Sequence, residues 1–515
     1  MNHKYRFLFN GVVLATAGII IRTIAVSFNG YVSGRIGAEG MGLYSLVMSV
    51  YGFAVTLAAS GVNLAVVRMT AEAVASGGGK ADTGRIMGRG VLYGLVFGCL
   101  SAAVVFLSAG FVGRTLLGDD RSVLSLRTMA LGMPAISVTS ALGGYFTGVG
   151  RAYKNAVVSA IEQVVKILLI ICGIVIFLPM GTKYTCFAVV AGGTVAELWS
   201  LIVSFVMYLW DRRNLPQSDG RNPHRSVMAK IFSIAMPVAV GSYIRQGLTT
   251  AEHMAIPWGL RKSGDEPRRA MESYGVLSGM ALPLVLYPSA IIGAFTGLLV
   301  PELAGLAETG RYDDVRRLSM TAVRLAVMFS VGVSGVMGFF GYELGYGVYS
   351  SGEAGNYIRS LAPLVPLMFL DTTVDCILKG LGEQVYTMKV NIIDAAICLI
   401  SVLLLVPEMG IAGYIVVIYI SEAVNAALSI YRMQKITGLE IGAGVMLIPF
   451  LFVAASYSAV NIIDNIMLYG MGVCVGVGMR IVIFGVIYAL ICLIWECNLG
   501  DKKEISKKCK KICFF

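Results

Sequence analysis

The sequence predicts an all-α integral membrane protein with about 14 transmembrane helices, arranged as two six-helix pseudo-symmetric lobes followed by two C-terminal helices. Three observations predict this class. Of the 515 residues, 57% are hydrophobic and only 14% are charged, which excludes an ordinary soluble domain. Apolar runs long enough to cross about 30 Å of hydrocarbon follow one another along almost the whole chain. The second half also repeats landmarks of the first half.

The apolar runs are predicted to be helices that span the membrane. They lack the period-two alternation of membrane strands, and a helix satisfies its own backbone hydrogen bonds in lipid. The connections between them are too short for a folded soluble domain. With boundaries good to a few residues, the predicted spans are 8–30, 42–66, 88–112, 123–149, 156–178, 185–210, 231–256, 272–300, 319–341, 357–378, 385–407, 411–431, 441–463 and 472–496.

An internal repeat relates the two halves of the chain. The segment Thr147-Gly148-Val149-Gly150-Arg151 recurs as Lys379-Gly380-Leu381-Gly382-Glu383, at an offset of 232 residues. Repeated bundles of hydrophobic helices are how many transporters form two halves around a central site. Other landmarks keep the same or a similar spacing: Pro134 and Pro366, Arg127 and Arg359, Glu162 and Asp394, and Arg22 and Arg245.

This repeat sets the expected domain organisation. Each copy has six predicted helices, so both lobes begin on the same side of the membrane and have the same orientation. We expect an N-lobe at 1–210, a cytoplasmic linker at 211–230, a C-lobe at 231–434, two further helices at 435–498, and a basic cytoplasmic tail at 499–515. A cleft between two such lobes can open to either face of the membrane.

The net charge of +11 indicates membrane topology rather than nucleic-acid binding, because the basic residues gather in alternate loops. The positive-inside rule predicts that both termini lie in the cytoplasm. We therefore expect a multi-pass protein of the bacterial cytoplasmic membrane. The phospholipid bilayer is therefore an expected partner. Among the residues predicted to lie inside are Lys4, Arg68, Arg85, Arg89, Arg151, Lys154, Arg212, Arg213, Lys230, Arg311, Arg316, Arg317, Arg432 and Lys435.

Two arginines form the strongest candidate binding site. Arg22 and Arg245 each lie about fourteen residues into a predicted helix, too deep for the side chain to reach water easily. Guanidinium is the best side-chain match for phosphate oxygens, and two such groups facing one cleft repel unless an anion lies between them. We expect them to bind the diphosphate of an anionic substrate. The alternative pairs each arginine with a buried carboxylate such as Glu252.

Acidic residues inside predicted spans are candidates for coupling or gating through H⁺ or Na⁺. They are Glu162 and its repeat equivalent Asp394, Glu252, and the pair Asp371 and Asp375, which stand four apart on one helix face. Two carboxylates on one face raise each other's proton affinity. The alternative is that some of these residues form salt bridges between helices.

No catalytic motif is present, so the chain is not predicted to be an enzyme. It lacks a Gly-x4-Gly-Lys-Ser/Thr run, which argues against the use of ATP. Its three histidines leave little from which to form a metal site. We expect no cofactor and no metal.

The segment Gly37-Ala38-Glu39-Gly40-Met41-Gly42-Leu43-Tyr44-Ser45-Leu46, which follows the helix of Arg22, resembles the opening of polysaccharide transporters in the multidrug/oligosaccharidyl-lipid/polysaccharide exporter superfamily. Phe232 to Arg245 and the repeated Gly-x-Gly before the fifth and eleventh helices are similar too. The resemblance covers residues 5–500 and extends to the stage V sporulation protein B group and the lipid II flippases. Arg22 falls where those flippases carry a cavity arginine, whereas Phe28-Asn29 replaces their further Arg-Asp pair.

The resemblance implies a flippase that moves an undecaprenyl-diphosphate-linked saccharide across the cytoplasmic membrane by alternating access. A lipid II-like peptidoglycan precursor and a polysaccharide repeat unit are both substrates of this kind. The alternative is a cation-coupled multidrug exporter of the same superfamily, which a cavity rich in carboxylate would favour. A membrane-embedded glycan polymerase would need large outer loops, and the predicted outer loops are short.

Overall fold

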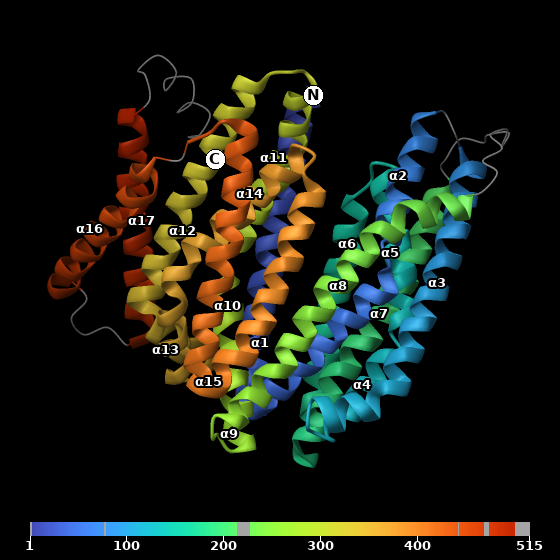
Figure 1. Ribbon diagram of the computed structural model, residues 1–515, viewed down its shortest axis with the longest axis horizontal. Coiled ribbons are helices and arrows are strands. Elements are labelled where there is room, and N and C mark those ends of the chain that lie inside the picture. Colours follow the sequence, from blue (N-terminus) through green and yellow to red (C-terminus); the bar gives the residue numbers. More distant parts are fainter. Residues whose placement is uncertain (1–2, 77–78, 214–226, 441, 468–472, 500–515) are drawn as a thin grey trace. The chain divides into compact units, whose positions relative to one another are not determined.

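The computed structural model describes residues 3–76, 79–213, 227–440, 442–467 and 473–499, and every element within these ranges is a helix (Figure 1). The predicted all-α membrane fold is confirmed. Most of the predicted linker (214–226) and of the predicted basic tail (500–515) lies outside the described residues. The α-helices of the first half are α1 (His3–Ala59), α2 (Val62–Ala75), α3 (Lys80–Phe111), α4 (Ser122–Ala130), α5 (Met133–Gly148), α6 (Tyr153–Phe177) and α7 (Thr182–Arg213).

The remaining α-helices follow in the second half of the chain. They are α8 (Val227–Lys262), α9 (Pro267–Tyr274), α10 (Leu282–Leu286), α11 (Ser289–Glu308), α12 (Tyr312–Tyr349), α13 (Gly352–Leu361), α14 (Val365–Gly380), α15 (Gln384–Thr437), α16 (Ala443–Met467) and α17 (Val473–Leu499). Short π-helices are η1 (Val112–Leu116) and η3 (Gly275–Ala281), and short 3₁₀ helices are η2 (Leu178–Met180) and η4 (Ala362–Leu364).

The described helices are long and apolar enough for a multi-pass membrane protein. Ten of them can cross a membrane by length and composition, or eleven when the bent pair α4 and α5 counts as one span. Two of the ten are stretches of 54 residues, Arg22–Ala75 and Gln384–Thr437. Each contains a glycine with non-helical backbone, Gly37 (φ 73°) and Gly410 (φ 60°). Each stretch therefore joins two predicted spans, which agrees with about 14 spans in all.

Some predicted spans are less regular than the sequence suggests. The predicted span 42–66 breaks at Ser60 and Gly61, both at positive φ, and Gly61 fits against the Ala235 backbone where an added Cβ would lie 2.7 Å from the carbonyl oxygen. The predicted span 272–300 is divided among α9, η3, α10 and α11. Pro288 lies between α10 and α11. Proline has no backbone N–H to donate to the helical ladder, so the helix is interrupted there.

The first compact unit comprises Met1–Met280 and Met388–Ser421. Its α1 turns back at Gly37 (Figure 1). Helix α3 packs closely on α5, since a Cβ at Gly98 would lie 2.8 Å from the Pro134 Cα and small residues let backbones approach. Buried apolar side chains of α2, α3 and α5, including Val66, Met87 and Tyr145, form its core.

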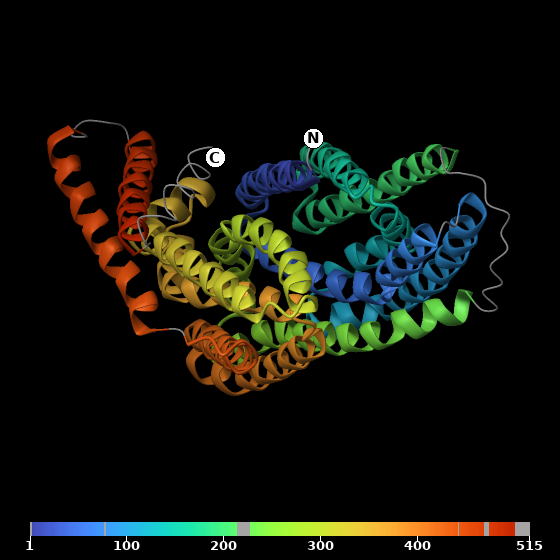
Figure 2. The same ribbon diagram turned by 90° about the horizontal axis from the view of Figure 1, so that it is seen from above.

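The second compact unit comprises Ala281–Thr387 and Glu422–Phe515. Its core joins α11, α12 and α14 through side chains such as Leu303, Val323 and Val374. The C-terminal helices α16 and α17, drawn in red in Figures 1 and 2, both contact α12. These two units divide the chain differently from the predicted lobes 1–210 and 231–434, so the lobe boundaries stay a prediction.

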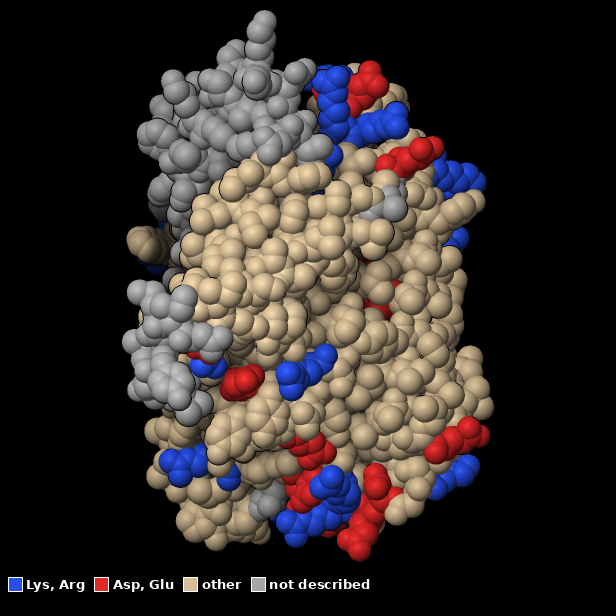
Figure 3. Space-filling model, turned by 90° about the vertical axis from the view of Figure 1, so that its left-hand side faces the viewer, with Lys and Arg blue, Asp and Glu red and all other residues tan. Residues whose placement is uncertain are grey.

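The surface of the described chain has the charge distribution of a membrane protein. Figure 3 shows one face on which Lys, Arg, Asp and Glu gather toward the two ends, with a broad belt between that carries few charges. Large apolar side chains are exposed along several spans, for example Leu107 on α3 and Val482 on α17. Such exposure is expected where a helix faces lipid rather than water.

Candidate functional site

The two predicted anion-binding arginines lie on α1 and α8 of the first unit, and both side chains are exposed. Around Arg245, α8 packs on the second segment of α1: Thr250 donates to the Ser49 carbonyl (3.2 Å), and Tyr243 bonds to Ser60. Arg245 also acts electrostatically on Asp394. The pairing of Arg22 with Arg245 around one substrate stays a prediction.

A buried carboxylate lies within the helices of the first half. Glu197 on α7 is only 8% exposed. Its Oε1 accepts a hydrogen bond from the Tyr51 hydroxyl on α1, and its Oε2 has no hydrogen-bond partner among the described residues. Glu162 and Lys166 on α6 act on it electrostatically. An incompletely bonded carboxylate at this depth is costly, which makes it a functional candidate.

Lys166 on α6, four residues after Glu162, belongs to the same cluster. Lys166 and Glu197 together line a narrow cavity of about 20 Å³, so the lysine of α6 also lies beside α7. Two carboxyl groups and one amino group therefore gather where α6 meets α7.

Beside this cluster is a polar cavity of about 320 Å³. Five elements of the first unit enclose it: α1, α2, α5, α6 and α7. Its wall is rich in hydroxyl, amide and carboxyl groups. The polar residues that line it are Tyr51, Asn63, Thr139, Ser140, Asn155, Ser159, Glu162, Glu197, Ser200 and Ser204.

A second acidic cluster lies between α8 and α15 of the same unit. Asp394 accepts a hydrogen bond from the Ser421 hydroxyl (2.6 Å). Glu252, 8% exposed, lies within hydrogen-bonding reach of the Cys398 thiol and close enough to Asp394 for the two carboxylates to interact. The predicted candidates Glu252 and Asp394 are therefore brought together, although their positions differ by 142 in the sequence.

The predicted pair Asp371 and Asp375 lies on α14 of the second unit. Asp371 accepts a hydrogen bond from Asn425 (3.0 Å), and Asp375 pairs with Lys379 (3.4 Å). Each carboxylate thus has a different partner on the protein. Whether the pair takes part in coupling or gating stays a prediction.

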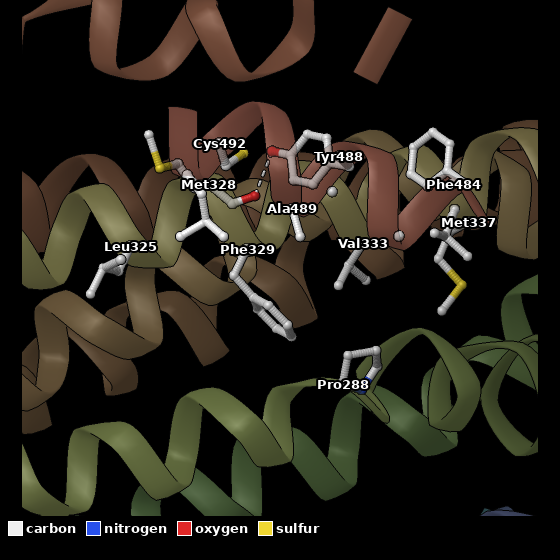
Figure 4. A pocket seen from close by; sticks show the side chains of 14 residues that line it. Pro288, Leu325, Met328, Phe329, Val333, Met337, Phe484, Tyr488, Ala489 and Cys492 are labelled. Carbon is white, nitrogen blue, oxygen red and sulfur yellow. Dashed lines mark hydrogen bonds between the residues drawn. The ribbon is translucent and has the colours of Figure 1, made fainter. Parts of the chain in front are cut away.

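An apolar pocket of about 580 Å³ lies in the second unit between α12 and α17 (Figure 4). Met328, Phe329, Phe484 and Tyr488 are among its lining, with Pro288 on the facing side in Figure 4. The Tyr488 hydroxyl donates to the Met328 carbonyl (2.7 Å), which satisfies the polar end of this ring. The pocket therefore offers hydrocarbon and aromatic surface to a ligand.

Several polar residues of the first-half cavity were not predicted from the sequence. Tyr51, Asn63, Thr139, Asn155 and Ser200 are single uncharged polar residues in apolar helices, a pattern too common to select them. One signal in the sequence could have drawn attention to Thr139: the repeat aligns it with Asp371, which was a predicted candidate.

Known proteins resemble the chain along most of its length. A family model described as polysaccharide biosynthesis protein matches residues 7–306. Stage V sporulation protein B of Bacillus subtilis (strain 168) is 25% identical over 512 residues, 98% of each chain. Lipid II flippase MurJ of the same organism is 23% identical over 450 residues, 79% of each chain.

The fold is also known from solved structures. A structure of lipid II flippase MurJ in an inward closed conformation matches 95% of this chain and 99% of its own, with a TM-score of 0.72 and 10% sequence identity. The family match spans more than half of the chain. The chain therefore belongs to the polysaccharide biosynthesis protein family, in the polysaccharide transporter branch of the multidrug/oligosaccharidyl-lipid/polysaccharide exporter superfamily.

Proposed function

We propose that this protein is a flippase that moves an undecaprenyl-diphosphate-linked saccharide across the cytoplasmic membrane by alternating access. A lipid II-like precursor or a polysaccharide repeat unit would be its cargo. The name of one relative, lipid II flippase, supports this class of substrate. Two lobes, 1–210 and 231–434, would open in turn to the two faces, with both termini in the cytoplasm.

The observation that carries this proposal is the exposure of two arginines within long apolar helices. Arg22 and Arg245 are exposed on α1 and α8, although a charged side chain in mid-membrane costs at least about 2.5–3.5 kcal/mol on insertion scales. An exposed guanidinium within an apolar helix is accessible to an anionic ligand. A lipid diphosphate supplies oxygens that match guanidinium donors in pairs.

The apolar pocket between α12 and α17 supports the same class of substrate. Its volume of about 580 Å³ and its lining of Met328, Phe329 and Phe484 suit a segment of isoprenoid chain. The pocket would hold part of the lipid chain of such a substrate.

The carboxylates provide a route to ion coupling. An inside-negative membrane potential favours outward movement of an anion by about 2.3 kcal/mol per charge per 100 mV across the full field. Glu252 and Asp394, and separately Asp371 and Asp375, would bind H⁺ or Na⁺ in one lobe conformation and release it in the other. Glu162 would act in the same way in the first half.

A second candidate, a cation-coupled multidrug exporter of the same superfamily, is favoured by one specific observation. The first-half cavity carries Glu162 and Glu197, and the α8–α15 cluster carries Glu252 and Asp394. Carboxylates of this kind attract cationic compounds. The two functions differ in their dependence on the arginines, which only an anionic substrate requires.

Genetic rescue followed by identification of the accumulated lipid tests the proposal. The gene is expressed in a bacterium depleted of its flippase for lipid-linked precursors, and the precursors are identified by mass spectrometry. We expect the wild type to restore growth and clear the accumulated precursor, and Arg22→Ala or Arg245→Ala to do neither. Efflux of cationic dyes that persists in both arginine variants would favour the exporter instead.

A further inference from the structure

The polar cavity of the first half has the composition of a sugar-binding site rather than of a helix interface. Its wall combines hydroxyl groups from α5 and α7 with the amide side chains of Asn63 and Asn155. Asn155 donates through Nδ2 to the Gly143 carbonyl (3.0 Å), and Asn63 donates to the Ser140 carbonyl (2.9 Å). These bonds fix both amides in place at the cavity.

Three residues of this wall have buried polar atoms without a hydrogen-bond partner among the described residues. They are Glu197 through Oε2, Ser200 through Oγ and Thr139 through Oγ1. Glu197 is 8% exposed and Ser200 is 2% exposed. Buried polar groups are nearly always hydrogen-bonded, and each exception calls for a cause. Three exceptions around one cavity indicate that a ligand rich in donors and acceptors completes the site.

We propose that this cavity binds a glycosyl residue of the transported lipid-linked saccharide, and that it selects a neutral or amino sugar over a carboxylated one. Sugar hydroxyls donate to the Glu197 and Glu162 carboxyl groups and to the Asn155 amide oxygen, and they accept from the hydroxyl groups of the wall. Among the described residues that line the cavity there is no Lys or Arg, so the carboxylate of a uronic acid finds no cationic partner there. This inference rests on the proposed function and names the chemistry of the cargo.

The size of the cavity limits how much of the saccharide it holds. A volume of about 320 Å³ lies at the small end of the range for ligand pockets, about 300–1,000 Å³. It accommodates a single sugar ring with a few waters rather than a long oligosaccharide. The remaining sugars of a larger cargo would lie outside it.

Two kinds of variant test the site without removing a charge. Thr139→Val and Ser200→Ala together delete two hydroxyls that have no hydrogen-bond partner among the described residues, so no hydrogen bond seen in the structure is lost. Gly143→Leu fills the cavity instead: a Cβ there lies 3.4 Å from Asn155 and 3.5 Å from Asn63, which is ordinary contact. Gly88→Leu on α3, where nothing lies within 4 Å of an added Cβ, is the matched control.

Binding of three radiolabelled probes to the purified full-length protein supplies the test. The probes are farnesyl diphosphate alone, farnesyl diphosphate linked to N-acetylglucosamine, and farnesyl diphosphate linked to glucuronic acid. We expect the wild type to bind the N-acetylglucosamine probe about tenfold more tightly than either of the others, which corresponds to a few added hydrogen bonds. The double variant and Gly143→Leu should lose this preference yet bind farnesyl diphosphate unchanged. Gly88→Leu should keep both the preference and the binding of farnesyl diphosphate.

The outcomes separate this inference from the proposed function. Equal binding of all three probes by the wild type, or an unchanged preference in both cavity variants, overturns the sugar site and leaves the diphosphate site standing. A change in the sodium dependence of binding without a change in sugar preference shows an ion site and also overturns it. Failure of the wild type to bind even farnesyl diphosphate overturns the proposed function and this inference together.

Discussion

The repeat places Glu162 on α6 and Asp394 on α15 at equivalent positions, but the fold surrounds them differently. Glu162 borders an open polar cavity and has Lys166 one turn away on its own helix. Asp394 instead accepts a hydrogen bond from Ser421, and Cys398 stands where the lysine would be. Buried tyrosines, Tyr274 and Tyr414, lie close to Glu252 in that second cluster.

This difference shows how two copies of one helical bundle can take different tasks. A cavity with hydroxyl, amide and carboxyl groups has room for a ligand of many atoms. A compact cluster in which Glu252 faces Asp394, with Arg245 nearby, suits a single small cation. We therefore expect the first-half site to bind cargo in addition to the ion proposed for Glu162, and the second cluster to bind a coupling ion alone.

The largest effect is expected from Arg22→Ala and Arg245→Ala, each of which should abolish transport while the protein remains folded in the membrane. Lost hydrogen bonds to a charged group are worth about 1.5–3 kcal/mol, or one to two orders of magnitude in substrate affinity. Lysine at either position should retain part of the activity, because the charge remains but the paired donors are lost. Flipping of a fluorescent polyprenyl diphosphate lipid in proteoliposomes measures this.

Arg245 also connects this experiment to the comparison between the two clusters. Because Arg245 acts on Asp394, Arg245→Ala should change ion dependence as well as substrate affinity, whereas Arg22→Ala should change affinity alone. Normal rescue by both alanine variants would contradict the anion site. Identical ion dependence in both variants would show that Arg245 does not influence ion binding at the second cluster.

Exchanging the residue that distinguishes the copies should have the next largest effect. Cys398→Lys adds to the second cluster a fixed cation beside Glu252, in addition to Arg245, so transport should lose most of its dependence on Na⁺ or pH. The larger side chain at a buried position should also cost about 1–3 kcal/mol of stability. Initial flipping rates at graded sodium concentration and pH measure the first effect, with Cys398→Ser as the control. Ion dependence that survives in Cys398→Lys would assign coupling to another site.

A third acidic site tests whether coupling belongs to the second cluster alone. Replacing both Asp371 and Asp375 by Asn should change the response of transport to pH or Na⁺ and leave substrate binding largely intact, because two carboxylates repel a diphosphate. The hydrogen bond from Asn425 and the pair with Lys379 would both be weakened. Loss of binding with unchanged ion dependence would instead support a cationic substrate and the multidrug exporter.

The smallest expected effect concerns the first-half cluster. Tyr51→Phe removes the hydrogen bond to the buried Glu197 carboxylate and should lower stability by about 1–3 kcal/mol, since a buried acceptor loses its donor. Tyr44→Phe, on the same helix and lining the same narrow cavity, should change it less. Thermal unfolding in detergent measures both. Equal shifts would show that the Tyr51 hydroxyl does not stabilise Glu197.

The sequence was sufficient for the membrane class, the helical secondary structure and most of the spans, because each of these follows from local hydrophobicity along the chain. It also indicated Glu252 and Asp394 separately as costly charges, since the penalty for a charge in lipid depends on the residue alone. The breaks at Gly37 and Gly410 fall between predicted spans, while the break at Gly61 and the division of 272–300 were not predicted.

Only the tertiary structure decided which of these residues meet. Tyr51, Thr139, Asn155 and Glu197 come from four helices, and no local pattern relates their positions. Their convergence depends on how α1, α5, α6 and α7 rotate and pack, which is set by close contacts such as that of Gly192 on α7 against Ile170 on α6. Hydrophobicity determines whether a helix enters the membrane. Which face of the helix contacts a neighbour depends on side-chain packing across the bundle.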